Sequence, residues 1–154
     1  MGVPNTEPIF TLTPRAQSVQ LTAATSSNRS DGTGTLGADM FEAFTAASNG
    51  SYAKEMRIKI ASSAASTAFV ANVIRVYLST AAQSTGTTLT SSDTRLLTEV
   101  AIPALTAGAT AAATPDFIVP LNFALPTLSH LIVGAGSSWT PGPIFHVTTF
   151  GGDY

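Results

Sequence analysis

Few of the residues that could do chemistry stand close enough together to suggest a catalytic site. The stretch Asp31-Gly32-Thr33-Gly34 resembles a phosphate or calcium loop at first sight. A P-loop, however, needs a Lys followed by Ser or Thr after its glycines, and an EF-hand needs further oxygen ligands and a terminal Glu. Neither pattern follows, so we expect an ordinary hairpin or Asx turn here.

The titratable residues are equally scattered. His130 and His146 are the only histidines, and the sequence places no carboxylate or third histidine near them to complete a metal site. No Gly-x-Ser-x-Gly motif frames a serine. Glycoside hydrolysis needs two paired carboxylates, and the acidic residues that could form such a pair are Glu42, Glu55, Glu99 and Asp116. Glu55 and Glu99 occupy outward-facing strand positions, where solvated salt bridges are the expected role. We therefore predict a protein that is not an enzyme, with no catalytic residue, cofactor or metal ion.

Trp139 stands in a loop with Pro141 and Pro143. Indole rings are enriched at interface hot spots and in sugar-binding platforms. The same ring could instead cap one end of a hydrophobic core, and the sequence leaves both interpretations open.

The amino-acid composition argues against nucleic-acid and membrane partners. Only 10% of the 154 residues are charged, against about 25% in ordinary domains, and the net charge is −2. Such a chain offers no electrostatic footprint for nucleic acid. It holds no apolar run of membrane-spanning length and no signal-peptide pattern in residues 1–7, so we expect no membrane partner. With no cysteine it has no disulfides. A low-charge surface rich in Ala, Ser, Thr and Gly suits a protein that neighbouring subunits cover.

The elements that must position these residues centre on Lys54–Leu78, where two segments alternate with period two. The expected inward side chains are Met56, Ile58, Ile60, Ile74, Val76 and Leu78. Glu55, Arg57, Lys59, Arg75 and Tyr77 fall on the opposite, wet side. We expect the two segments to pair as a central part of one antiparallel sheet. Glu55, Arg57, Lys59 and Arg75 then form either a solvated face or salt bridges to a neighbouring subunit.

Other segments of the sequence also have the pattern of short β-strands. Short strands are predicted at 9–13 (ended by Pro14), 16–23, 36–46, 95–102, 117–125, 130–133 and 144–150. In 95–102, Leu96, Val100 and Ile102 face inward. In 117–125 the alternation is clearest, and Pro120 on its opposite face indicates an edge strand or a bulge. Residues 80–92 and 105–114 read as loops. The sum is an all-β protein, an antiparallel β-sandwich of the jelly-roll or Greek-key kind with about 8–9 strands. Residues 1–13 form an extended arm with a first short strand, and residues 14–154 a single sandwich domain.

Several short motifs occur together in order: Thr11-Leu12-Thr13-Pro14, the 31–34 loop, Phe44-Thr45-Ala46, Asn49-Gly50-Ser51, Met56-Arg57-Ile58-Lys59, Leu97-Thr98-Glu99-Val100, Pro120-Leu121-Asn122 and the final Thr149-Phe150-Gly151-Gly152-Asp153-Tyr154. With them the chain resembles small virion structural proteins of tailed bacteriophages and prophages, most closely the capsid decoration (cement) type. The resemblance implies a homotrimer that binds the major capsid protein on the capsid surface of a virion assembled in the host bacterial cytoplasm.

Two expectations follow from this resemblance. The proline-containing arm, with Pro4 and Pro8, is a candidate for reaching a neighbour by adding a strand to an exposed sheet edge. The alternative function is a β-sandwich module of a tail fibre or baseplate that binds a host glycan or receptor. That alternative predicts a solvent-facing aromatic cluster formed by Trp139 and Tyr77.

Overall fold

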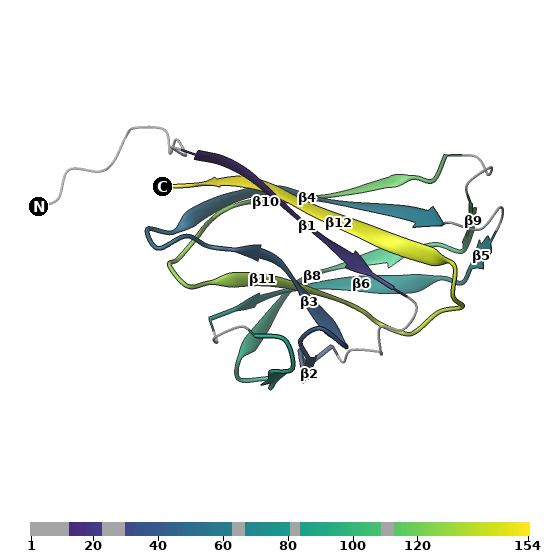
Figure 1. The fold of residues 1–154 in the computed structure, drawn as a ribbon, viewed down its shortest axis with the longest axis horizontal. Coiled ribbons are helices and arrows are strands. Elements are labelled where there is room, and N and C mark those ends of the chain that lie inside the picture. Colours follow the sequence, from purple (N-terminus) through teal and green to yellow (C-terminus); the bar gives the residue numbers. More distant parts are fainter. Residues whose placement is uncertain (1–12, 23–29, 63–66, 81–83, 109–112) are drawn as a thin grey trace, which may run out of the picture.

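The protein is built from two four-stranded antiparallel sheets packed face to face (Figure 1). The computed structural model describes residues 13–22, 30–62, 67–80, 84–108 and 113–154, and within them every regular element is a strand. The first sheet has the order β1 (Thr13–Leu21), β12 (Pro143–Asp153), β4 (Ser51–Ser62) and β10 (Asp116–Leu125). The second has the order β3 (Met40–Thr45), β11 (His130–Ala135), β6 (Asn72–Ser79) and β8 (Thr94–Ile102).

The order in which the long strands pair identifies the fold as a jelly roll. Leaving aside two short pairs, β2 (Gly34–Thr35) with β7 (Thr88–Leu89) and β5 (Thr67–Phe69) with β9 (Leu105–Ala107), eight strands remain. The first then pairs with the last (β1 with β12), the second with the seventh (β3 with β11), the third with the sixth (β4 with β10) and the fourth with the fifth (β6 with β8). This nested pairing, folded into two sheets, is the jelly-roll arrangement, and it confirms the predicted β-sandwich class.

The main core lies between the two sheets, where alternate side chains from each sheet meet. Met56, Ile58 and Ile60 of β4 are buried there against Ile74 and Val76 of β6, as the period-two pattern predicts. The alternation of β10 is confirmed too, with Val119 and Leu125 buried and the residues between them partly buried or exposed. Pro120 lies in an edge strand next to a register shift, so both features expected of it are present.

The two segments at the centre of the sequence prediction do not pair with each other. β4 lies between β12 and β10 in one sheet, whereas β6 lies between β11 and β8 in the other. Each segment has one apolar face. Two such faces can meet in one core whether the two strands are neighbours in the same sheet or lie in opposite sheets. Period-two alternation reports the face and not the pairing partner, so the prediction of a shared sheet was wrong, although five of the six expected inward residues do share the main core. After the register shift between Val76 and Tyr77 the expected faces fail: Tyr77 is fully buried and Leu78 is only partly buried.

Smaller departures have local causes. Pro14 does not end a strand: β1 runs through it, because at a sheet edge a missing N–H need not interrupt the ladder. Leu96 is exposed rather than inward. Thr98 pairs with Val76 but Leu96 pairs with Tyr77, so Leu97 is an extra residue and the alternation of β8 changes phase there. The two predicted loops at 80–92 and 105–114 contain the short strands β7 and β9.

Candidate interaction surface

The four carboxylates considered for catalysis each have a partner within the chain. Oxygen atoms of Glu55, Glu99 and Asp116 lie 2.8, 2.7 and 2.8 Å from the nearest side-chain nitrogens of Arg57, Arg75 and Lys59 respectively, and Glu42 Oε2 lies 2.8 Å from His130 Nδ1. The hydrogen bond from Lys59, with its positive charge, lowers the pKa of Asp116. The predicted outward salt bridges of Glu55 and Glu99 are therefore confirmed.

The Asp31 loop is the turn that the sequence predicts. The backbone N–H and the hydroxyl of Thr33 both donate to Asp31 Oδ1, at 3.1 and 2.9 Å, which is the geometry of an Asx turn. Asp39 and Asp93 instead accept from backbone N–H groups earlier in the chain, those of Thr35 and Thr90. The hydrogen bonds with Thr90 lower the pKa of Asp93. Across the described ranges, no group of three or more His, Cys, Asp or Glu side chains could hold a metal ion.

The pair between Glu42 and His130 was missed at the sequence level. Glu42 belongs to β3 and His130 to β11, and the two residues are 88 positions apart in the chain. The two strands are neighbours, with a register shift close to this pair. The side chain of His130 is only 11% exposed, whereas Glu42 also borders a shallow depression of about 270 Å³ with Leu36, Phe41 and Thr85. No local spacing signals this pair, because only the strand pairing brings the two residues together.

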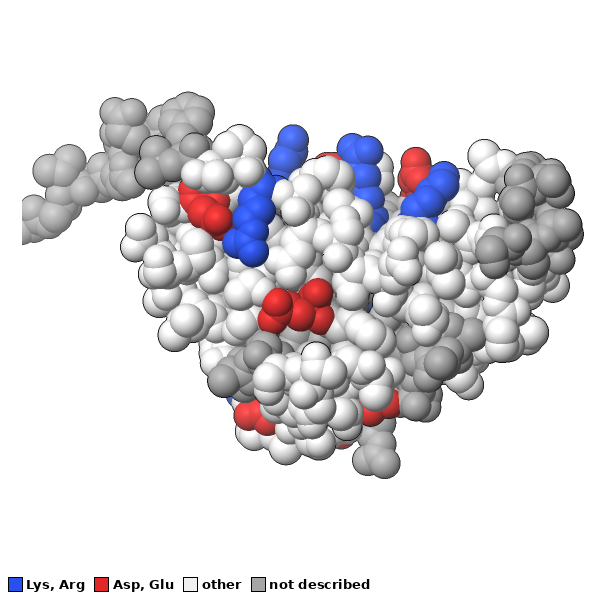
Figure 2. All heavy atoms as spheres, in the orientation of Figure 1, with Lys and Arg blue, Asp and Glu red and all other residues white. Residues whose placement is uncertain are grey.

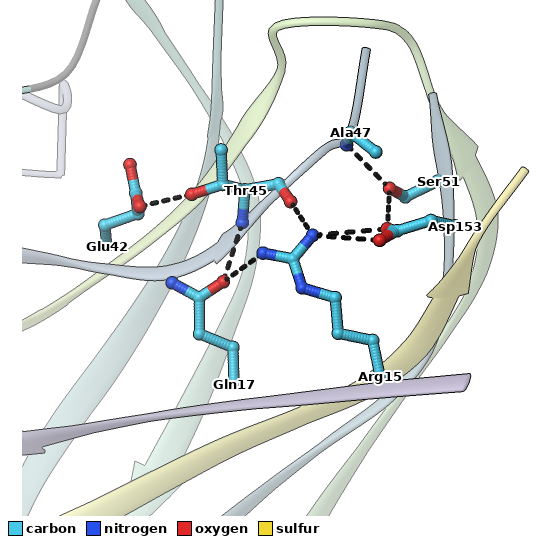
Figure 3. Close-up of polar contacts among 7 residues, drawn as sticks. All are labelled: Arg15, Gln17, Glu42, Thr45, Ala47, Ser51 and Asp153. Carbon is cyan, nitrogen blue, oxygen red and sulfur yellow. Dashed lines mark hydrogen bonds and ion pairs between the residues drawn. The ribbon is translucent and has the colours of Figure 1, made fainter. Parts of the chain in front are cut away.

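One open side of the sandwich is closed by a polar network around Arg15 (Figure 3). Arg15 Nη1 donates to the Thr45 carbonyl oxygen at 2.8 Å and lies 3.2 Å from Asp153 Oδ1. Gln17 Oε1 accepts from the Thr45 backbone N–H at 3.0 Å, and the Ser51 hydroxyl donates to Asp153 at 2.6 Å. Side chains of β1 thus bind both backbone groups of Thr45 in β3, and so join the two sheets.

Trp139 caps one end of the core. Its ring is 8% exposed, makes edge-to-face contacts with Phe69 and Phe145, and donates its Nε1–H to the Pro143 carbonyl oxygen at 2.8 Å. Tyr77 is fully buried in a separate cluster with Met40 and neighbouring residues, beneath the β2–β7 pair. Trp139 and Tyr77 therefore do not form a solvent-facing aromatic cluster.

The candidate interface residues are distributed over both sheets. Arg57 and Lys59 lie on the outer face of β4, with the Arg57 guanidinium 5.5 Å from the Phe150 ring centroid, whereas Arg75 belongs to β6 in the opposite sheet. Figure 2 shows Lys and Arg gathered along the rim over the β1–β12–β4–β10 sheet, while most of the remaining visible surface is uncharged. Pro4 and Pro8 lie outside the described residues. No helix in the described ranges is long and apolar enough to cross a membrane.

No protein-family model and no curated protein matches the sequence. Among solved structures, the chain is similar to that of an infectious bursal disease virus Gx strain, with 17% identity, a TM-score of 0.27, and coverage of 96% of this chain and 36% of the other. A crystal structure of an IBDV particle gives 16% identity, a TM-score of 0.30 and coverage of 98% and 39%. The chain therefore spans well under half of the length of these viral chains, and a likeness this weak carries no functional conclusion.

Proposed function

We propose that this chain is a non-enzymatic structural protein of a virion, and specifically a decoration (cement) protein that binds the assembled lattice of a major capsid protein. The observation that carries the non-enzymatic part of the proposal is how the acidic residues are used. The sequence has nine Asp and Glu, of which Glu7 lies outside the described residues, and each of the other eight has a partner within the chain. Three cap turns and five pair with Arg, Lys or His.

This use of charge favours a binding role over a catalytic one. Catalytic groups are expected to have perturbed pKa values within a shared cleft. Here the two lowered pKa values belong to Asp93, which is partly exposed and caps a turn, and to Asp116, which is exposed and forms a salt bridge with Lys59. The low overall charge, the jelly-roll fold and the sequence resemblance together support attachment to other virion subunits, with three copies of the chain forming a homotrimer on the capsid surface.

The mechanism would be mass action. A subunit that binds only assembled capsid stabilises it by RT ln(1 + [L]/Kd), about 2.7 kcal/mol per site at a hundredfold excess over Kd. Because the lattice repeats this contact many times, the particle as a whole would better resist the pressure of its packaged genome.

The experiment that tests the proposal is incubation of the purified chain with assembled, undecorated capsids and with unassembled capsid protein, followed by cosedimentation and cryo-electron microscopy. We expect binding to assembled capsids only, at regularly repeated lattice positions. Density at the tail, or equal binding to unassembled subunits, would overturn the cement role. The variants Glu99→Gln and Asp116→Asn should cosediment with assembled capsids as the natural chain does, because the proposal assigns neither carboxylate a role in a chemical step.

The competing candidate, also a structural protein of a virion, is a tail-fibre or baseplate module that binds a host glycan or receptor. It predicts an exposed aromatic platform, whereas Trp139 and Tyr77 are buried in different clusters. We favour the capsid for this reason. A glycan-array screen of the same preparation addresses the alternative directly.

A further inference from the structure

The two main sheets have four edge strands, and two of these carry features that hinder the addition of another strand. In β10, Pro120 lacks an N–H and the register with β4 shifts between Pro120 and Phe123. In β8, Leu97 is an extra residue that interrupts the pairing with β6. Bulges and edge prolines are devices by which natural sheets avoid edge-to-edge association. Although β8 exposes Leu96 and Leu97, its broken register makes it a poor template.

The third edge, β3, is occupied by side chains of its own molecule. It has only six residues, and its register with β11 shifts between Glu42 and Phe44. At its end, the N–H and the C=O of Thr45 are bound by Gln17 and Arg15 (Figure 3). These two side chains take the positions that an added strand would need.

Within the part of the chain that the structure describes, the fourth edge, β1, has neither kind of hindrance along most of its length. It pairs with β12 over nine residues, from Thr13 to Leu21, without a register shift. Its proline is at the second position, so the remainder of the strand can donate. The exposed side chains of its outer face are Pro14, Ala16, Ser18 and Gln20, which carry no charge. An uninterrupted edge without a charged residue on its outer face is the kind that accepts another strand.

We propose that the β1 edge binds residues 1–12 of a second copy of this chain, so that neighbouring copies exchange their N-terminal segments. The segment continues directly into Thr13, the first residue of β1. Twelve extended residues span about 40 Å, and the nine residues of β1 span about 30 Å. The segment is therefore long enough to pair along the whole of a neighbouring β1.

The direction of the segment also suits exchange. When two copies meet at the N-terminal ends of their β1 strands, each segment 1–12 runs along the other copy's β1 in the antiparallel sense, the pairing that the rest of this sheet uses. Pro4 and Pro8 are four positions apart, so in an extended strand both lack an N–H on the same side. With that side turned away from β1, no ladder hydrogen bond is lost.

This inference deepens the proposed assembly role by naming the contact between copies, but its test needs no capsid, so the two can fail separately. The natural chain has no cysteine, so single cysteines can be introduced without background. We would mix the full-length Thr6→Cys variant with Ala16→Cys or Gln20→Cys, oxidise at high protein concentration, and measure covalent dimers. The control acceptor is Ala101→Cys, which is exposed on the bulged edge strand β8.

We expect a covalent dimer with at least one β1 acceptor, at a yield tenfold or more above that of the β8 control. Deletion of residues 1–8 should abolish self-association in sedimentation experiments while leaving the circular dichroism spectrum unchanged. Equal yields for β1 and β8 acceptors would overturn the proposal. So would a chain carrying both Thr6→Cys and Ala16→Cys that closes an internal disulfide and stays monomeric, because the segment would then bind its own β1.

Discussion

At the scale of single residues, Arg15 is the polar side chain on which the closure of the sandwich most depends. Its guanidinium binds the Thr45 carbonyl oxygen and the Asp153 carboxylate, and lies 4.9 Å from the Phe44 ring centroid. We predict that Arg15→Ala lowers the free energy of unfolding by about 2–3 kcal/mol, because a charge-assisted hydrogen bond is lost and its partners stay partly buried. Equilibrium urea unfolding measures this change.

A second arginine provides the matched control. Arg57 also forms a salt bridge and contacts an aromatic ring, but 53% of its side chain is exposed. Arg57→Ala should therefore cost only about 0–1 kcal/mol, as exposed ion pairs usually do. If the two substitutions had equal effects, the network around Arg15 would not be what joins the sheets.

At the scale of elements, the sequence predicts faces well and partners poorly. The buried sides of β4 and β10 follow from alternation along each strand, which depends only on local residues. That β4 and β6 lie in opposite sheets depends on contacts between distant residues, and nothing in either segment specifies it. The pair of Glu42 with His130 is hidden for the same reason. The assignment of the Asp31 turn succeeded because an Asx turn is formed within three residues.

Register shifts explain the remaining side-chain error. A single extra residue in β8 turns Leu96 to the outer face, although its spacing from Val100 is that of an inward residue. Bulges leave only weak sequence signals, apart from glycine or proline at some of them.

Gly151 gives a test of such an irregularity. It lies where the register of β12 with β4 shifts, and a Cβ added there would lie 2.1 Å from the Tyr52 carbonyl oxygen. We predict that Gly151→Ala destabilises the fold by roughly 2–4 kcal/mol, because backbone atoms of two central strands would have to separate. In thermal unfolding this should appear as a clearly lowered midpoint.

The control for this substitution is Gly86→Ala, where an added Cβ would meet nothing within 4 Å. Its cost should be about 1–2 kcal/mol and should come from the positive φ of 91° alone. A Gly151→Ala variant no less stable than this control would show that β4 and β12 can adjust to the added carbon without cost.

At the scale of the whole molecule, the two sheets share one main core, beside which two smaller buried clusters lie. The main cluster draws residues from both sheets and extends to Phe69 and Trp139 at one end. Neither sheet can keep its inner face buried without the other, so partial unfolding would expose most of the apolar surface at once. Such a structure is expected to unfold in a single cooperative step.

The single tryptophan makes this expectation measurable. Trp139 fluorescence reports the capped end of the core, whereas far-ultraviolet circular dichroism reports all strands together. We predict that urea transitions followed by the two probes coincide in midpoint and slope, as two-state unfolding requires. An earlier fluorescence transition would mean that the Trp139 end opens independently, and residues 14–154 would then not behave as one cooperative domain. Refolding should also be slow for a chain of this length. The first long strand, β1, pairs with the last, β12, so the first sheet depends on contacts between residues far apart in the sequence.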